Sequence, residues 1–206
     1  RDFFLPSPSC PVPGRVRPSR ASFFATMLIT WVVLAVLLFW AVGAYNRLIR
    51  LRSAAVQAFG GLDAHLVRMM AMLGDYEATQ VPEPAPSDAR AALWAATTQF
   101  GASLAAARAR PLDAGAAAAL TAAHRVLDTA WQAVVREAQE RHVAQGRSAD
   151  EDAMAAWVLR REQHLAQNAL AQQQFNEAVA QYNGAIAQFP AALLAWLFGF
   201  KPAQAL

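Results

Sequence analysis

Cysteine is nearly absent from this sequence, because the 206 residues include only Cys10. A single cysteine excludes an intrachain disulfide framework and a zinc site built from several cysteines of this chain. Charge is missing from residues 21–46, which contain no Asp, Glu, Lys or Arg. A β-strand pattern is missing too, since the β-branched residues follow helical spacing and alanine is abundant. We therefore predict an all-α fold.

Motifs that mark catalytic or metal sites are also missing. The four histidines stand alone, with no HExxH or Glu-x-x-His arrangement that would place two ligands on one helical face. The sequence contains no glycine-rich phosphate loop and no nucleophile elbow. We therefore expect no enzymatic activity, no bound metal and no cofactor. These histidines are His65, His124, His142 and His164.

A basic surface is missing from most of the chain despite the formal net charge of +3. Residues 1–26 carry four arginines and one aspartate, which leaves 14 basic and 14 acidic residues for residues 27–206. The charges there are interspersed and form no basic stripe of the kind that contacts phosphate backbones. We therefore expect no nucleic-acid partner.

The uncharged run is strongly apolar, and its centre reads FFATMLITWVVLAVLLFWAVG. A helix needs about 20 such residues to cross roughly 30 Å of hydrocarbon. We predict a single transmembrane helix at residues 23–44, with Trp31, Trp40 and Tyr45 as interfacial anchors. The alternative is a signal peptide cleaved after VGA, before Tyr45. The run exceeds the roughly 7–15 apolar residues of such a peptide, and helical patterning continues beyond it, so we favour the anchor.

The residues before the run read RDFFLPSPSCPVPGRVRPSR and show no periodicity. Such a segment cannot bury a core, so residues 1–22 are expected to be a disordered extension. Met27 begins the apolar helix, which suggests that residues 1–26 precede the native start. Without these residues, the nearest arginines all follow the helix, and the positive-inside rule places the body in the cytoplasm. With them, Arg15, Arg17 and Arg20 balance the later Arg47, Arg50 and Arg52.

Four helices are expected. The first continues from the membrane segment and the other three follow it, and together they form a helical bundle over residues 45–190. Proline-rich or glycine-containing breaks separate them, including VPEPAPSD, Pro111 and Gly146. A capping box of Ser148 and Glu151 marks the start of the last one. The short connections predict an elongated antiparallel arrangement of three to four long helices. The expected boundaries are the membrane segment to Thr79, Ser87 or Asp88 to Arg110, Asp113 to Gln145, and Ser148 to Gln188.

Polar residues interrupt the apolar seam of the last long helix at Arg161, Asn168 and Gln172. Polar residues at such positions fix register in coiled coils, and they are compatible with self-association into a homo-oligomer. Two interior glycines, Gly60 and Gly61, should cost roughly 1 kcal/mol each relative to alanine. We expect them to permit close packing against Trp131 or Trp157, with a hinge as the alternative.

Residues 191–206 form an apolar C-terminal tail that is too short to span a membrane. In one interpretation, the tail is an interfacial anchor built on Trp196, Phe198, Phe200 and Lys201. In the other, leucines and Trp196 close the end of the bundle. Periodicity does not distinguish the two, because the run is apolar throughout. The second interpretation uses Leu193, Leu194, Trp196 and Leu197.

Two stretches carry a resemblance, AYNRLIRLRSAAVQAFGGLDAHL after the apolar run and QQQFNEAVAQYNGAIAQFPAALLAWLFGF near the other end. With the N-terminal membrane helix, they resemble the LemA family of bacterial membrane proteins. The chain departs from the family pattern at Phe59, where the family has Trp, and it lacks the central Tyr-Pro motif. The family-motif and candidate interaction residues are Tyr45, Asn46, Arg52, Asp63, Phe175, Asn176, Tyr182, Asn183, Phe189 and Pro190.

The resemblance implies a helical fold and a location in the bacterial cell envelope, but no established reaction. Family members are often encoded near membrane metalloproteases and TPM-domain proteins, which implies an envelope protease or a TPM-domain protein as partner. We therefore expect a membrane-anchored scaffold or adaptor, with a metal-dependent enzyme or a regulator of a neighbouring protease as the alternative. We expect the Tyr-Asn pairs to pack, with each Asn bonded to a neighbouring helix; a docking surface is the alternative.

Overall fold

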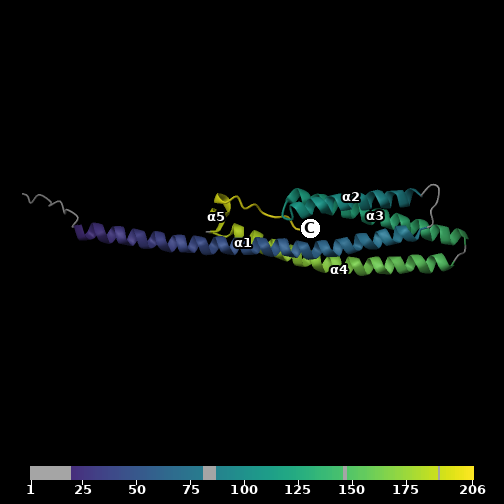
Figure 1. Cartoon of the computed structure of the whole chain (residues 1–206), viewed down its shortest axis with the longest axis horizontal. Helices are drawn as coiled ribbons and strands as arrows, with labels where there is room; N and C mark the ends of the chain where they lie inside the picture. The colour runs from purple at the N-terminus through teal and green to yellow at the C-terminus, as the bar shows by residue number, and fades with distance from the viewer. Residues whose placement is uncertain (1–19, 81–86, 146–147, 190) are drawn as a thin grey trace, which may run out of the picture. The chain divides into compact units, whose positions relative to one another are not determined.

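The computed structural model describes residues 20–80, 87–145, 148–189 and 191–206, and it gives the backbone alone at residues 20–23, 145 and 148–151. All regular secondary structure in these ranges is helical, which confirms the predicted all-α class (Figure 1). Residues 1–19 of the expected extension at residues 1–22 lie outside the described residues, as does Pro190. The side chains of the Ser148–Glu151 capping box are not described either. The helices are α1 (Arg20–Thr79), α2 (Asp88–Ala109), α3 (Ala114–Gln145), α4 (Ser148–Ala187) and α5 (Ala191–Leu197).

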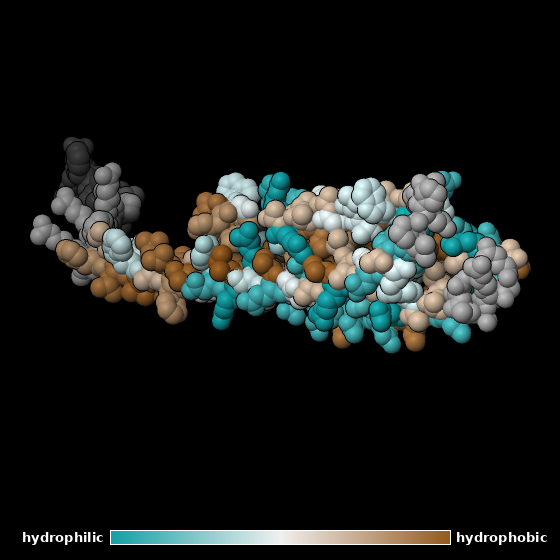
Figure 2. All heavy atoms as spheres, turned by 45° about the vertical axis from the view of Figure 1, so that its right-hand side comes forward, coloured by the Kyte–Doolittle hydropathy of each residue, from teal (hydrophilic) through white to brown (hydrophobic). Residues whose placement is uncertain are grey.

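The chain divides into two compact units, Arg1–Val42 and Gly43–Leu206. In the first, the described part of α1 presents large apolar side chains outward, as the brown spheres in Figure 2 show. Among the described helices, only α1 is long and apolar enough to cross a membrane. Unshielded apolar side chains around a helix suit contact with lipid. This helix accords with the predicted anchor at residues 23–44, and its insertion in a membrane remains a prediction.

In the second unit, α1 pairs antiparallel with α2 and with α4. Asp63 contacts Arg108 and Glu77 contacts Arg90, so rising numbers in α1 meet falling numbers in α2. Three contacts between α1 and α4 run in the same antiparallel sense, namely Phe59 with Phe175, Met69 with Asn168, and Tyr76 with Trp157. The predicted antiparallel bundle is therefore confirmed.

The helix ends follow local sequence signals closely. Ser87 caps α2, with the Arg90 backbone N–H donating to Ser87 Oγ at 3.4 Å. The helix stops before Pro111, and the carboxylate of Asp113 accepts the N–H of Ala116 at 2.9 Å to cap α3. Each predicted boundary lies within a residue or two of the observed one.

Aromatic rings fill the core where α1, α3 and α4 meet. Tyr76 packs edge-to-face against Trp131 at 5.3 Å and against Trp157 at 5.7 Å between ring centroids. Such pairs add to the stabilisation from burying each ring. Leu73, Met69 and other apolar residues at helical spacing continue this core along α1. The 3.6-residue period in the sequence therefore corresponds to the buried face.

The predicted close packing at Gly60 and Gly61 is wrong. A Cβ atom built on either glycine meets no atom within 4 Å, and both residues are exposed. The two tryptophans proposed as their partners pack against Tyr76 instead. A glycine in close contact with another helix is Gly101, since a Cβ built there lies 3.0 Å from Met70 Cε.

Replacing Gly60 or Gly61 by alanine should therefore stabilise the protein. We expect each change to raise the free energy of unfolding by about 0.8–1 kcal/mol, because alanine gains helix propensity and meets no obstacle. Thermal or denaturant unfolding of the purified chain measures the change. Gly101→Ala is the matched control and should gain less, because Met70 must move. Destabilisation by Gly60→Ala would contradict the open surface described here.

Candidate functional site

The most specific side-chain arrangement on α4 is a pair of asparagines that hold the C-terminal tail. Asn183 Oδ1 accepts the N–H of Ala203 at 2.9 Å, while Asn183 Nδ2 donates to the Ala203 carbonyl at 2.8 Å. Asn176 binds Leu206 in the same way, at 2.9 and 2.8 Å. Each amide thus satisfies both backbone groups of one tail residue. We call Asn176 and Asn183, with Tyr182, the tail clamp.

The spacing of the clamp matches an extended chain. Asn176 and Asn183 are seven residues apart, which places them on the same helical face about 10.5 Å apart. The three residues from Ala203 to Leu206 span roughly 10 Å when the chain is extended. Because polyproline II conformation repeats every three residues, Ala203 and Leu206 can present the same side of the backbone to α4. Pro202 favours such a conformation.

Tyr182 completes the clamp from the same helix. Its hydroxyl donates to the Lys201 carbonyl at 3.0 Å, and its ring is buried. Burial raises the pKa of Tyr182 above 10.0, while Arg52 acts in the opposite direction. Phe175 is fully buried and packs edge-to-face on Phe59 at 5.7 Å. The second quoted stretch therefore supplies both the clamp and the core residues that position it.

The prediction that each asparagine bonds a neighbouring helix is wrong for Asn176 and Asn183. We expected each Asn to bond a neighbouring helix, whereas Asn176 and Asn183 bond the irregular segment after α5. The family-motif residue Phe189 follows the end of α4 at Ala187, and its side chain is 82% exposed. Pro190 lies outside the described residues. A tail without periodicity gave no sign of its docking, although two asparagines seven residues apart were a usable signal.

The tail itself divides into an exposed part and a packed part. Leu193, Trp196 and Leu197 are exposed and Leu194 is half-buried, so the interpretation in which these residues close the bundle is wrong for three of the four. Phe200, Ala203 and Leu206 pack against the core instead. Contact of the exposed part with lipid remains a prediction.

The N-terminal motif residues take separate positions. The ring of Tyr45 lies 5.0 Å from that of Phe198 and 6.1 Å from that of Phe200, so this residue joins the tail. Asn46 is exposed. Asp63 accepts a hydrogen bond from Arg108 Nε at 2.7 Å on the surface between α1 and α2. The structure therefore unites Tyr45 with the tail and leaves Asn46 and Asp63 apart from it.

A model of the LemA family matches residues 98–206, which is more than half of the chain. The chain belongs to the LemA family. The matched range includes the tail clamp and the residues that it holds, whereas Tyr45, Asn46, Arg52 and Asp63 precede it. No curated protein and no solved structure matches the chain.

Polar side chains also lie inside the bundle of this LemA-family chain. Arg161 Nη2 donates to Asp128 Oδ1 at 2.6 Å, and the Arg161 side chain is only 8% exposed. Its guanidinium lies 5.5 Å from the centre of the Trp131 ring. Asn168 is buried, and its Nδ2 donates to Met69 Sδ at 3.3 Å while its Oδ1 has no partner. Arg161 and Asn168 thus occupy the seam as predicted.

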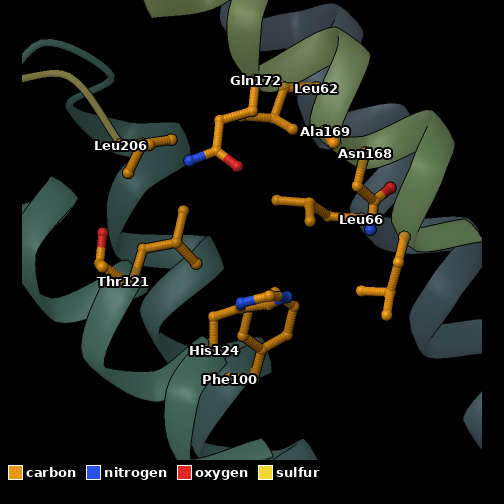
Figure 3. A pocket seen from close by; sticks show the side chains of 11 residues that line it. Leu62, Leu66, Phe100, Thr121, His124, Asn168, Ala169, Gln172 and Leu206 are labelled. Carbon is orange, nitrogen blue, oxygen red and sulfur yellow. The ribbon is translucent and has the colours of Figure 1, made fainter. Parts of the chain in front are cut away.

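A pocket of about 230 Å³ opens between the helices beside Asn168. Figure 3 shows the Gln172 amide and the His124 ring reaching toward it from opposite sides, with Leu206 at its edge. Leucines and Phe100 supply most of the remaining wall. Within the described ranges, no group of three or more His, Cys, Asp or Glu side chains could hold a metal ion.

His124 should make stability depend on pH. Burial lowers the pKa of His124 below 6.5, with Asp128 opposing and Arg161 reinforcing that shift. A folded-state pKa below the unfolded value means that the unfolded chain binds more protons. The stabilisation is therefore complete above about pH 6.5 and is lost as the pH falls through the folded pKa.

We expect His124→Gln to reduce the loss of melting temperature between pH 7.5 and pH 5, measured against the wild-type chain under the same conditions. Thr129→Ala, at an exposed position on the same helix, removes no titratable group and is the control that should leave the pH dependence unchanged. An identical pH dependence in His124→Gln and wild type would contradict the assignment.

Proposed function

We propose that this LemA-family chain is a membrane-anchored adaptor that binds a segment of another protein. The apolar part of α1 is suited to act as the anchor in the bacterial inner membrane. We place the remaining helices on the cytoplasmic side, an assignment that holds only without residues 1–26, because their arginines otherwise balance those after the span. This proposal assigns the chain a binding role and no chemical step.

The tail clamp is the observation that carries the proposal. Asn176 and Asn183 bind backbone N–H and C=O groups, and every peptide segment offers these groups. A partner in extended conformation can therefore take the place of residues 201–206 without a new type of contact. In this scheme the protein's own tail occupies the binding surface until a partner exchanges with it.

The side chains of the tail define what such a partner must carry. Ala203 is buried, so its position accepts only a small residue. Leu206 lies at the edge of an apolar pocket, so the position three residues later favours a leucine-sized apolar side chain. The preceding Pro202 is exposed and pre-forms the extended backbone. The partner segment is therefore of the class Pro-small-x-x-Leu.

A peptide titration tests the exchange. The full chain with Ala203→Asp and Leu206→Asp should release its tail. Position 203 is buried and position 206 is half-buried, so a carboxylate at either position is unfavourable. A labelled peptide of residues 200–206 should bind this variant at least about ten-fold more tightly than the wild-type chain. Adding Asn176→Ala and Asn183→Ala should remove the binding. Equal binding with and without the two asparagines would overturn the proposal.

Photo-crosslinking in cells tests whether a natural partner uses the surface. Ala180 lies between the two asparagines on the same face of α4 and is exposed, so it can carry the crosslinker. Val143 on α3 is equally accessible and is the control position. An adduct at Ala180, mapped by mass spectrometry to a Pro-small-x-x-Leu segment and increased by tail release, supports the proposal. The partner so identified distinguishes an envelope protease, a TPM-domain protein and a second copy of the chain. The same crosslinked proteins in the same amounts at Ala180 and Val143 would contradict the proposal.

A further inference from the structure

A second pocket, of about 510 Å³, lies where the tail begins. It is lined by residues from α1, from the turn between α2 and α3, from α4 and from the tail. Two of the family-motif residues, Tyr45 and Arg52, meet Tyr182 of the tail clamp there. The tail-clamp proposal gives no role to Arg52.

Positive charge dominates this pocket. Arg52, Arg110 and Lys201 reach it from three different parts of the chain, and Asp113 supplies the only carboxylate among its lining residues. Within the part of the chain that the structure describes, no ion pair engages any of the three cations. The Asp113 carboxylate is occupied, since it accepts the Ala116 N–H at 2.9 Å. Three cations without acidic partners around one hollow favour an anionic ligand.

Aromatic and apolar side chains form the other wall. The Tyr45 ring packs against Phe198 in a tilted arrangement and edge-to-face against Phe200, and all three rings line the pocket with Ile49. A ligand that fits must therefore carry an anionic group for the cations and apolar carbon for the rings. An anionic phospholipid has both.

We infer that this pocket binds a phosphate group, and that the head group of an anionic phospholipid supplies it. Arg52 and Arg110 offer forked guanidinium donors that match phosphate oxygens, and Lys201 adds a point charge. Tyr45 directly follows the predicted membrane segment at residues 23–44. If that segment spans the membrane, Tyr45 lies at its end, at head-group level.

The ligand would also influence the tail. Lys201 belongs to the clamped segment, and its carbonyl accepts the Tyr182 hydroxyl. The complete pocket therefore exists only while the tail is docked. A bound phosphate stabilises the docked state and opposes exchange with a partner segment.

A thermal-shift experiment on the full chain in a neutral detergent tests this site. The probes are dihexanoyl phosphatidylglycerol, dihexanoyl phosphatidylcholine and inorganic phosphate. Phosphatidylglycerol should raise the melting temperature in a saturable way, since a ligand of the folded state stabilises it by mass action. Phosphatidylcholine should have little effect, and inorganic phosphate should bind at least about ten-fold more weakly because it lacks the apolar contacts.

Matched variants separate the pocket from general surface charge. Arg52→Gln with Lys201→Gln should weaken the apparent affinity for phosphatidylglycerol roughly 10- to 100-fold. Arg125→Gln with Arg136→Gln removes the same charge from exposed positions on α3 and should leave it unchanged. An equal response to inorganic phosphate would support the phosphate site but overturn the lipid source. An equal response to phosphatidylcholine, or no difference between the two double variants, would overturn the site.

Discussion

Replacing Asn176 and Asn183 together by alanine should release residues 201–206 from α4. The double variant loses four hydrogen bonds of 2.8–2.9 Å, and each typically contributes about 0.5–1.5 kcal/mol net. The expected loss is therefore about 2–6 kcal/mol of the free energy that holds the tail. Hydrogen exchange at residues 201–206 measures it directly, because the backbone N–H groups of Ala203 and Leu206 lose their acceptors.

The helical body should survive this change, because Tyr76 packs against Trp131 and Trp157 without contact to Asn176 or Asn183. Its helices should retain slow exchange while the tail exchanges rapidly. Asn46→Ala is the matched control, because Asn46 belongs to the other Tyr-Asn pair but is exposed. Unchanged tail protection in the double variant, or the same effect from Asn46→Ala, would rule out the clamp as the element that holds the tail.

The helix boundaries could be predicted from the sequence, whereas the docking of the tail on α4 could not. Ser87, Pro111 and Asp113 act on the backbone within a few residues, so they predicted the ends of α2 and α3 from local sequence. The partner of Asn183 lies 20 residues away in a segment with no periodicity. A polar side chain on a helix shows that a partner is needed, but its identity depends on the path of the whole chain.

The two glycines and the buried arginine both show that the sequence of one helix does not reveal which residue of another helix lies opposite. Gly60 and Gly61 signalled an exception to helix preference, and packing was the wrong cause because no neighbour approaches them. Arg161 was correctly placed on the seam by its register, yet its partner Asp128 lies on a different helix. Register predicts which side chains point inward, whereas charge pairing across helices requires their axial alignment as well.

Removing Asp128 should destabilise the bundle, because it leaves the charge of Arg161 without a partner. Its Oδ1 accepts a hydrogen bond from Arg161 Nη2 at 2.6 Å, and among the described residues Arg161 Nε has no partner. Asp128→Ala leaves a charge 8% exposed without a counterion. Breaking a fully buried pair costs about 3–5 kcal/mol, and because the Asp128 side chain is 40% exposed we expect about 2–3 kcal/mol, measured by denaturant unfolding.

The opposite single change should cost much less, and this asymmetry is the test. Arg161→Met removes the buried charge, keeps most of the apolar volume beside Trp131, and leaves Asp128 in contact with water and with Gln132 Nε2 at 3.3 Å. We expect a change within about 1 kcal/mol, because apolar replacement of a buried ion is often neutral. In the double variant, Arg161→Met should rescue most of the loss caused by Asp128→Ala, because the penalty arises from the unpaired guanidinium. Equal losses in both single variants, without rescue, would show instead that the attraction between the two side chains stabilises the bundle.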